Sequence, residues 1–318
     1  MFAEDNAPCS RVGPRRASLW LPIVIVSLGC CASCERASSE KSSTTVPAAA
    51  SPGPNSAADL SVLRSTFKTK LLRRALSPDV APEQPLPPDA RLIRYRSGEL
   101  LLKAWVSQDP GDQKRHPAVV CLHGNFVLEA RHWYACSEFQ DAGFVILAPM
   151  LRGENGNPGD FEMFLGEVDD VVAAGTYLSQ VPYVDPARVY VFGHSVGGTL
   201  AMLASMVPSP YRASVAVSGA ADQASWLEPQ PWNYKVYSHE NELETRIRSP
   251  RFFVDSIRCP LYLLTGDQED YFIPDLRSMA DEARRAGKTC VFETVPGDHY
   301  DSKPRGVRRA IEILKQLN

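Results

Sequence analysis

Six short apolar runs, alternating with segments long enough to be helices, restrict the fold of this chain more than any other feature. The runs are rich in β-branched and aromatic residues, which is typical of strands buried on both faces of a parallel sheet. A hairpin with its turn at Ser97-Gly98 precedes them. The pattern predicts an α/β fold, a doubly wound and mostly parallel sheet with helices on both faces, in one domain over residues 90–318. The runs are Ala118–Leu122, Phe144–Ala148, Val189–Phe192, Ser214–Val217, Leu261–Leu264 and Cys290–Thr294, and the helical segments are 132–142, 163–180, 197–206, 275–286 and 303–317.

The segment Gly193-His194-Ser195-Val196-Gly197 lies directly between a predicted strand and a predicted helix. A serine at such a sharp turn is held in strained backbone geometry, and a glycine on each side relieves the crowding. The turn also directs the hydroxyl away from the sheet. We therefore predict that Ser195 is a nucleophile, although a glycine-rich turn with an idle serine would look the same.

With these residues in place, the chain from about Ala90 onward resembles the α/β-hydrolase superfamily and, within it, the catalytic domain of the prolyl oligopeptidase family. Dienelactone-hydrolase-like proteins and acetylesterases share parts of the same pattern. The family's peptidases usually carry a β-propeller, for which 318 residues leave no room, and His123-Gly124-Asn125-Phe126 departs from the usual His-Gly-Gly-Pro. The stretches that carry the narrower resemblance are Leu151–Gly156, Val168–Val171, Tyr183–Val189 and Ser249–Pro260.

The resemblance implies a Ser-Asp-His triad in which His299, in the loop after the last strand, is the general base. The acid is expected in the loop 265–274. Asp270 lies four residues before Pro274, as the superfamily pattern favours, and Asp267 is the alternative acid. These two residues and Glu269 could also be solvated loop charges.

The resemblance also implies an oxyanion hole made by the backbone N–H groups of Val196 and Asn125. His123 is expected to support its loop by hydrogen bonding rather than to act as a base. Aromatic residues between 220 and 248 predict either a short lid over the site or simple packing. Within the expected sheet, Cys259 and Cys290 begin neighbouring strands, so they form either a disulfide or two unpaired thiols.

These features imply an exported serine hydrolase that cleaves an ester or amide bond through an acyl-enzyme, most like a prolyl oligopeptidase-type serine peptidase. The alternatives are a carboxylesterase or acetylesterase acting on small esters, and a catalytically idle binding lipoprotein. The expected partner is a small-molecule ester or peptide substrate, and no metal or organic cofactor is needed. Nucleic acid is not expected, because 34 basic residues face 37 acidic ones without a basic run in the second half of the chain.

The first 34 residues have the pattern of an export signal, in which three arginines precede a charge-free apolar stretch ending at Cys34. Ser27-Leu28-Gly29-Cys30 resembles the lipobox of lipoproteins, which would be lipidated at Cys30. An uncleaved anchor helix and twin-arginine export are the alternatives. Each interpretation places the remaining chain outside the cytoplasm, as a periplasmic protein or a membrane-anchored lipoprotein of a bacterium whose only membrane contact is this anchor.

Residues 35–58 are rich in Ser, Ala, Thr and Pro, which predicts a disordered tether. Residues 59–89 are predicted to be an amphipathic helix over Asp59–Leu76 followed by a stiff proline-rich linker. The helix has one apolar face and five basic residues, so it either lies on an anionic membrane or covers part of the domain.

Overall fold

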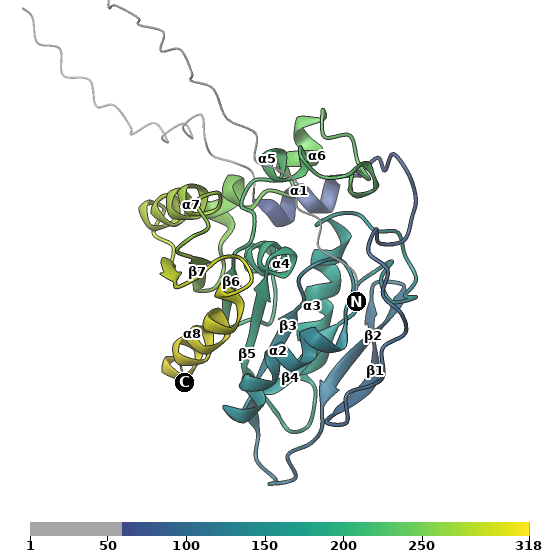
Figure 1. Cartoon of the computed structure of the whole chain (residues 1–318), viewed down its shortest axis with the longest axis vertical. Coiled ribbons are helices and arrows are strands. Elements are labelled where there is room, and N and C mark those ends of the chain that lie inside the picture. The colour runs from purple at the N-terminus through teal and green to yellow at the C-terminus, as the bar shows by residue number, and fades with distance from the viewer. Residues whose placement is uncertain (1–58, 318) are drawn as a thin grey trace, which may run out of the picture. The chain divides into compact units, whose positions relative to one another are not determined.

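In the computed structural model, which describes residues 59–317, eight strands form one sheet in the order β1-β2-β4-β3-β5-β6-β7-β8 (Figure 1). The β1–β2 hairpin and the β2–β4 pair are antiparallel, and all other pairs are parallel. The predicted α/β class and all six strands are therefore confirmed, but β8 lies at the edge of the sheet and is only partly buried. The strands are β1 (Ala90–Ser97), β2 (Leu100–Ser107), β3 (His116–Leu122), β4 (Val145–Pro149), β5 (Val184–His194), β6 (Ala213–Val217), β7 (Leu261–Gly266) and β8 (Cys290–Val295).

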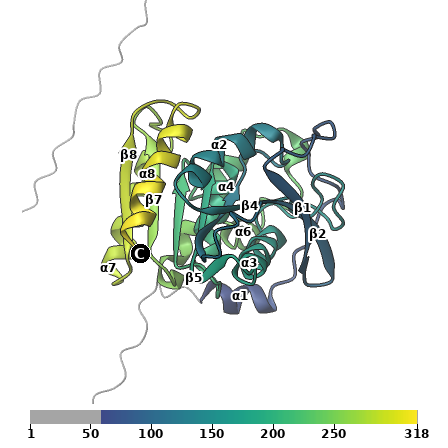
Figure 2. The same ribbon diagram turned by 90° about the horizontal axis from the view of Figure 1, so that it is seen from below.

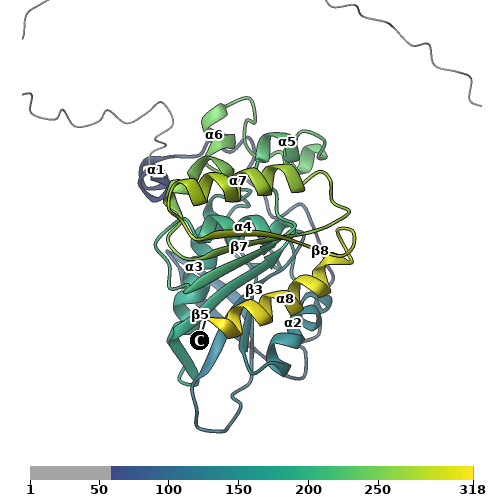
Figure 3. The same cartoon turned by 90° about the vertical axis from the view of Figure 1, so that its left-hand side faces the viewer.

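Helices cover both faces of this sheet (Figure 2, Figure 3). Side chains of a strand alternate between the two faces, so Val120 of β3 joins one buried cluster and Val119 joins the other. The first cluster includes α3 (Gly166–Ser179), α4 (Val196–Ala204) and α7 (Ile273–Arg285). The second includes α2 (Ala130–Asp141) and α8 (Ser302–Gln316). Strands buried on both faces explain the nearly uninterrupted apolar runs of the sequence.

The amphipathic helix is shorter than predicted and covers the domain. Helix α1 spans only Leu60–Thr66, and the backbone is extended at Phe67, where the helix ends. Beyond that point, the N–H of Lys70 donates to Glu244 Oε1 at 2.8 Å and that of Leu72 to the carbonyl of Val236 at 2.7 Å. These acceptors, both in the segment 220–248, take N–H groups that a longer helix would have used internally. That segment holds α5 (Gln223–Leu227), η1 (Trp232–Tyr234) and α6 (Glu242–Arg246), and η2 (Pro250–Ser256) follows it.

The predicted export signal, lipobox and tether lie outside the described residues. Among residues 59–317, no helix is both long and apolar enough to span a bilayer.

Of the two states considered for Cys259 and Cys290, the structure shows free thiols. The register of β7 against β8 explains this result, because Cys290 is paired with Leu261, two residues beyond Cys259.

Candidate active site

Ser195 occupies a strained turn between β5 and α4, as the sequence predicts. Its backbone has φ 59° and ψ −120°, a conformation that non-glycine residues rarely adopt. Close approach of the backbone explains the two glycines of the motif. A Cβ at Gly193 would lie 2.1 Å from the carbonyl oxygen of Gly197, and one at Gly197 would lie 2.5 Å from the carbonyl oxygen of Leu122. The N–H of Ser195 donates to the carbonyl of Val217 at 2.9 Å, which fixes the turn to β6.

His299 lies between the serine and a carboxylate. It follows β8, and its Nε2 is 3.0 Å from Ser195 Oγ. Its Nδ1 is 2.6 Å from Oε1 of Glu269. The predicted pairing of Ser195 with His299 is thus present in the structure.

The carboxylate that contacts His299 belongs to Glu269, so the structure corrects both predicted acids. Asp270 is exposed and makes no hydrogen bond to His299. Asp267 is also exposed, and its Oδ1 accepts the N–H of Gly297 at 2.8 Å, which ties the two loops together. The loop turns back at once, since the N–H of Glu269 donates to the carbonyl of Gly266 at 3.2 Å. This tight turn directs residue 269 toward the histidine and leaves its neighbours in solvent.

Glu269 is held as a carboxylate by a ring of donors. Its Oε2 accepts hydrogen bonds from the Ser218 hydroxyl, the Thr265 hydroxyl at 3.0 Å and the Gly266 N–H at 2.6 Å, while Oε1 faces His299. Burial by itself would raise the pKa of Glu269, but the hydrogen bonds from His299, Ser218 and Gly266 outweigh it and lower the pKa to about 2. The group is therefore charged at neutral pH and suited to orient the imidazole.

The two predicted oxyanion donors lie on either side of Ser195. Val196 follows Ser195 directly, and Asn125 lies in the loop after β3 with φ 63°. A Cβ built on Gly124 would lie 3.6 Å from the Cβ of Ser195, which places this loop against the serine. Among residues 59–317, neither the N–H of Val196 nor that of Asn125 donates to a protein acceptor.

The other histidines near the site have structural contacts. His123 Nε2 lies 3.1 Å from Glu154 Oε2, and although burial opposes its charged form, this carboxylate raises the pKa of His123. His194 donates from Nε2 to the carbonyl of His299 at 2.8 Å, which positions the loop after β8. Burial, followed by the charge of His299, lowers the pKa of His194 to about 3, so it stays neutral. His123 and His194 therefore support the two loops, as expected for His123.

Aromatic side chains from the segment 220–248 do pack beside the site. Trp226 and Tyr234 lie against Phe126, with ring centroids 6.4 and 5.6 Å away, and Trp226 also contacts Phe164 at 6.0 Å. Trp232, by contrast, is 74% exposed. Within the described residues, no group of three or more His, Cys, Asp or Glu side chains is arranged to hold a metal ion.

The sequence of the chain matches a known family. The model of the prolyl oligopeptidase family matches residues 133–314, which is more than half of the chain. The chain belongs to the prolyl oligopeptidase family. The predicted family is thereby confirmed, and membership in it supports the prediction of a serine hydrolase.

The similarity to an individual curated relative is moderate and covers part of each chain. An uncharacterized peptidase, YtmA, of Bacillus subtilis is 30% identical over 141 residues, which cover 42% of this chain and 54% of the relative. The chain thus spans about half the length of that relative.

Two solved structures show the same fold. An acylaminoacyl peptidase of Pyrococcus horikoshii superposes with a TM-score of 0.60 at 20% identity, over 71% of this chain and 41% of its own. S-formylglutathione hydrolase of Staphylococcus aureus superposes with a TM-score of 0.57 at 17% identity, over 72% of this chain and 98% of its own.

Proposed function

We propose that this protein is a serine peptidase that hydrolyses peptide or amide bonds through an acyl-enzyme intermediate. The observation that carries the proposal is the continuous chain from Ser195 Oγ through His299 to Glu269, built on a strained strand-to-helix turn. A nucleophile, a base and an orienting carboxylate within hydrogen-bond reach are the requirements of this chemistry. Family membership and the peptidase relatives support a peptide substrate.

In the proposed reaction, Ser195 Oγ attacks the substrate carbonyl carbon while His299 Nε2 takes the hydroxyl proton. Glu269 keeps the Nδ1 proton of His299 in place, which leaves Nε2 free to accept. The N–H groups of Val196 and Asn125 stabilise the oxyanion. His299 then protonates the leaving amine, and a water molecule, deprotonated by the same histidine, releases the acyl group from Ser195.

A serine-directed fluorophosphonate probe tests the proposed nucleophile. We expect labelling of the wild type and of Ser65→Ala, which removes an exposed hydroxyl on α1, and no labelling of Ser195→Ala. Equal labelling of all three proteins would overturn the assignment. A parallel assay of peptidyl p-nitroanilides and p-nitrophenyl acyl esters separates a peptidase from the esterase alternative, to which the S-formylglutathione hydrolase similarity lends support.

We also propose that the protein is exported and lipidated, since arginines precede an apolar stretch and Cys30 in the sequence. Metabolic labelling with a fatty acid, lost in Cys30→Ser, is the expected result. Label that persists in this variant would exclude Cys30 as the acceptor.

A further inference from the structure

A short segment that precedes the sheet holds both backbone groups of Phe126, the residue directly after the proposed oxyanion donor Asn125. We name residues 77–84 the strap. The hydroxyl of Ser77 donates to the carbonyl of Phe126, and the N–H of Phe126 donates to Asp79 Oδ2 at 2.9 Å. Three consecutive residues of the strap, Ser77 to Asp79, thus hold both the backbone donor and the backbone acceptor of a single loop residue.

These two bonds control the direction of the Asn125 backbone. Asn125 has φ 63°, in the left-handed region, where asparagine is tolerated but not favoured. The N–H of Phe126 belongs to the peptide unit that follows Asn125, and the N–H of Asn125 belongs to the unit before it. The bond to Asp79 therefore fixes the orientation of the second unit, which restricts the backbone rotation at Asn125. Without that acceptor, packing still holds the buried ring of Phe126. The peptide unit after Asn125 loses its fixed orientation, however, and the N–H of Asn125 loses its fixed direction with it.

Asp79 also connects the strap to the aromatic segment. Its Oδ1 accepts the hydroxyl of Tyr234 at 2.6 Å. Burial, followed by the bond to Asp79, raises the pKa of Tyr234 to about 12, so this hydroxyl remains a donor. The N–H of Ser77 in turn donates to the carbonyl of Gly153 at 3.0 Å. Asp79 therefore receives one donor from each of two separate segments.

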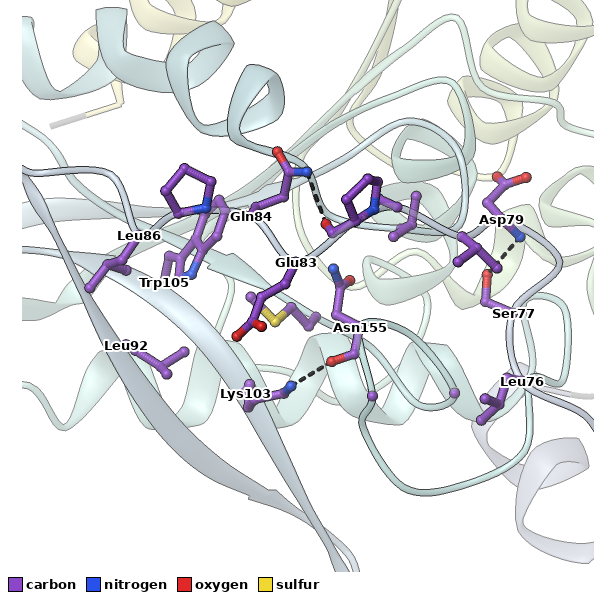
Figure 4. A pocket seen from close by; sticks show the side chains of 18 residues that line it. Leu76, Ser77, Asp79, Glu83, Gln84, Leu86, Leu92, Lys103, Trp105 and Asn155 are labelled. Carbon is purple, nitrogen blue, oxygen red and sulfur yellow. Dashed lines mark hydrogen bonds between the residues drawn. The ribbon is translucent and has the colours of Figure 1, made fainter.

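Packing contributes little to the position of the strap. Behind it lies a cavity of about 880 Å³, whose lining also includes Lys103, Trp105 and Met150 (Figure 4). Val80, in the middle of the strap, is 89% exposed. Since few apolar contacts hold this segment, hydrogen bonds hold it: those of Ser77 and Asp79 at one end, and at the other end Gln84, whose Oε1 accepts the N–H of Ala130 at 3.3 Å.

We propose that Asp79 is a positioning residue for catalysis, which aligns the oxyanion-binding N–H of Asn125 by holding Phe126. The proposal rests on the serine peptidase mechanism described above. Asp79 acts through its two hydrogen bonds and not through its charge, because a negative charge near a developing oxyanion is unfavourable. Asp79 and Ser77, which lie outside the sheet, thereby contribute to the position of the proposed oxyanion donor.

Three variants test this role. Asp79→Ala removes both bonds, and we expect kcat to fall about 10²-fold with little change in KM, the size expected when an oxyanion donor is misplaced. Asp79→Asn restores most of kcat, since its amide oxygen accepts from Phe126 and its NH₂ group donates to the Tyr234 oxygen. Glu83→Ala, which removes an exposed carboxylate of the same strap, leaves kcat unchanged.

A second measurement reports directly on the oxyanion hole. Benzeneboronic acid forms a tetrahedral adduct on the catalytic serine, so its inhibition constant should rise in parallel with the loss of kcat in Asp79→Ala. If that variant does not fold, Ser77→Ala serves instead, because it breaks only the bond to the Phe126 carbonyl. It should lower kcat and raise the inhibition constant in parallel, both by a smaller factor.

Wild-type kcat in a folded Asp79→Ala protein, or an equal loss in Asp79→Asn, would overturn the positioning role. In the Ser77→Ala fallback, wild-type kcat would overturn it too. A wild type that hydrolyses no substrate would instead overturn the proposed function.

Discussion

Replacing Glu269 by glutamine changes a single heavy atom, yet it should remove most of the activity. The Oε2 position accepts three donors, from Ser218, Thr265 and the N–H of Gly266. The amide oxygen of a glutamine must occupy this position, because an NH₂ group there would face three other donors. Its NH₂ group must then face His299 Nδ1.

An NH₂ group in that place selects the wrong tautomer of His299. It donates to Nδ1, so the proton of the neutral ring moves to Nε2, the atom that should accept the proton of Ser195. In a serine protease the equivalent change lowers kcat roughly 10⁴-fold, which corresponds to about 5 kcal/mol of lost transition-state stabilisation. We expect a loss of this size for Glu269→Gln, with KM nearly unchanged.

The matched controls are Asp270→Asn and Asp267→Asn, which neutralise the two neighbouring carboxylates. Neither side chain contacts His299, so both variants should keep kcat within about tenfold of the wild type. Steady-state hydrolysis of whichever p-nitroanilide or p-nitrophenyl substrate proves active measures all three. If Asp270→Asn loses more activity than Glu269→Gln, the triad inferred from the structure is wrong.

Three further predictions concern stability. The lowered pKa of Glu269 adds stability that is present above pH 4.5 and is lost as the pH falls toward 2, so urea unfolding should show the wild type's advantage over Glu269→Gln shrinking between pH 7 and pH 3. Gly193→Ala should lower Tm strongly because its Cβ meets backbone at 2.1 Å, whereas Gly124→Ala, with no neighbour closer than 3.5 Å, should not. In chemical denaturation, Phe139→Ala should lower the free energy of unfolding by about 3–5 kcal/mol, and Tyr134→Ala, exposed on the same helix, by less than about 1 kcal/mol. Similar losses for the two glycine variants, or for Phe139→Ala and Tyr134→Ala, would contradict the packing described.

The fold, the serine and the histidine could be predicted because the signals for them are local. Ser195 lies between a strand and a helix that are adjacent in sequence, and His299 lies in the loop after the last strand. The carboxylate could not be chosen in the same way. Glu269 is selected by a tight turn onto Gly266 and by a hydroxyl from Ser218, which is distant in sequence. One signal was available. In the superfamily pattern the triad acid most commonly lies one residue closer to the glycine at the strand end than Asp270 lies to Gly266.

The extent of the first helix was predicted wrongly for a related reason. The apolar period continues to Leu71, but Glu244 and the carbonyl of Val236 capture the backbone N–H groups there. These acceptors are more than 160 residues away in the sequence. Helical periodicity reports which side chains face the core, and it does not reveal a competing partner from a distant segment.

The long reach of these N-terminal contacts sets an order on folding. The N–H of Leu60 donates to Ser256 Oγ across 196 residues, and Asp79 meets Tyr234 across 155. The N-terminal segment is synthesised first, but the residues that it contacts are not present until most of the chain has been made. Contacts of such high sequence separation form late and slowly. We therefore expect hydrolytic activity to return after secondary structure during refolding. A newly made molecule would then form its sheet before it is able to hydrolyse substrate.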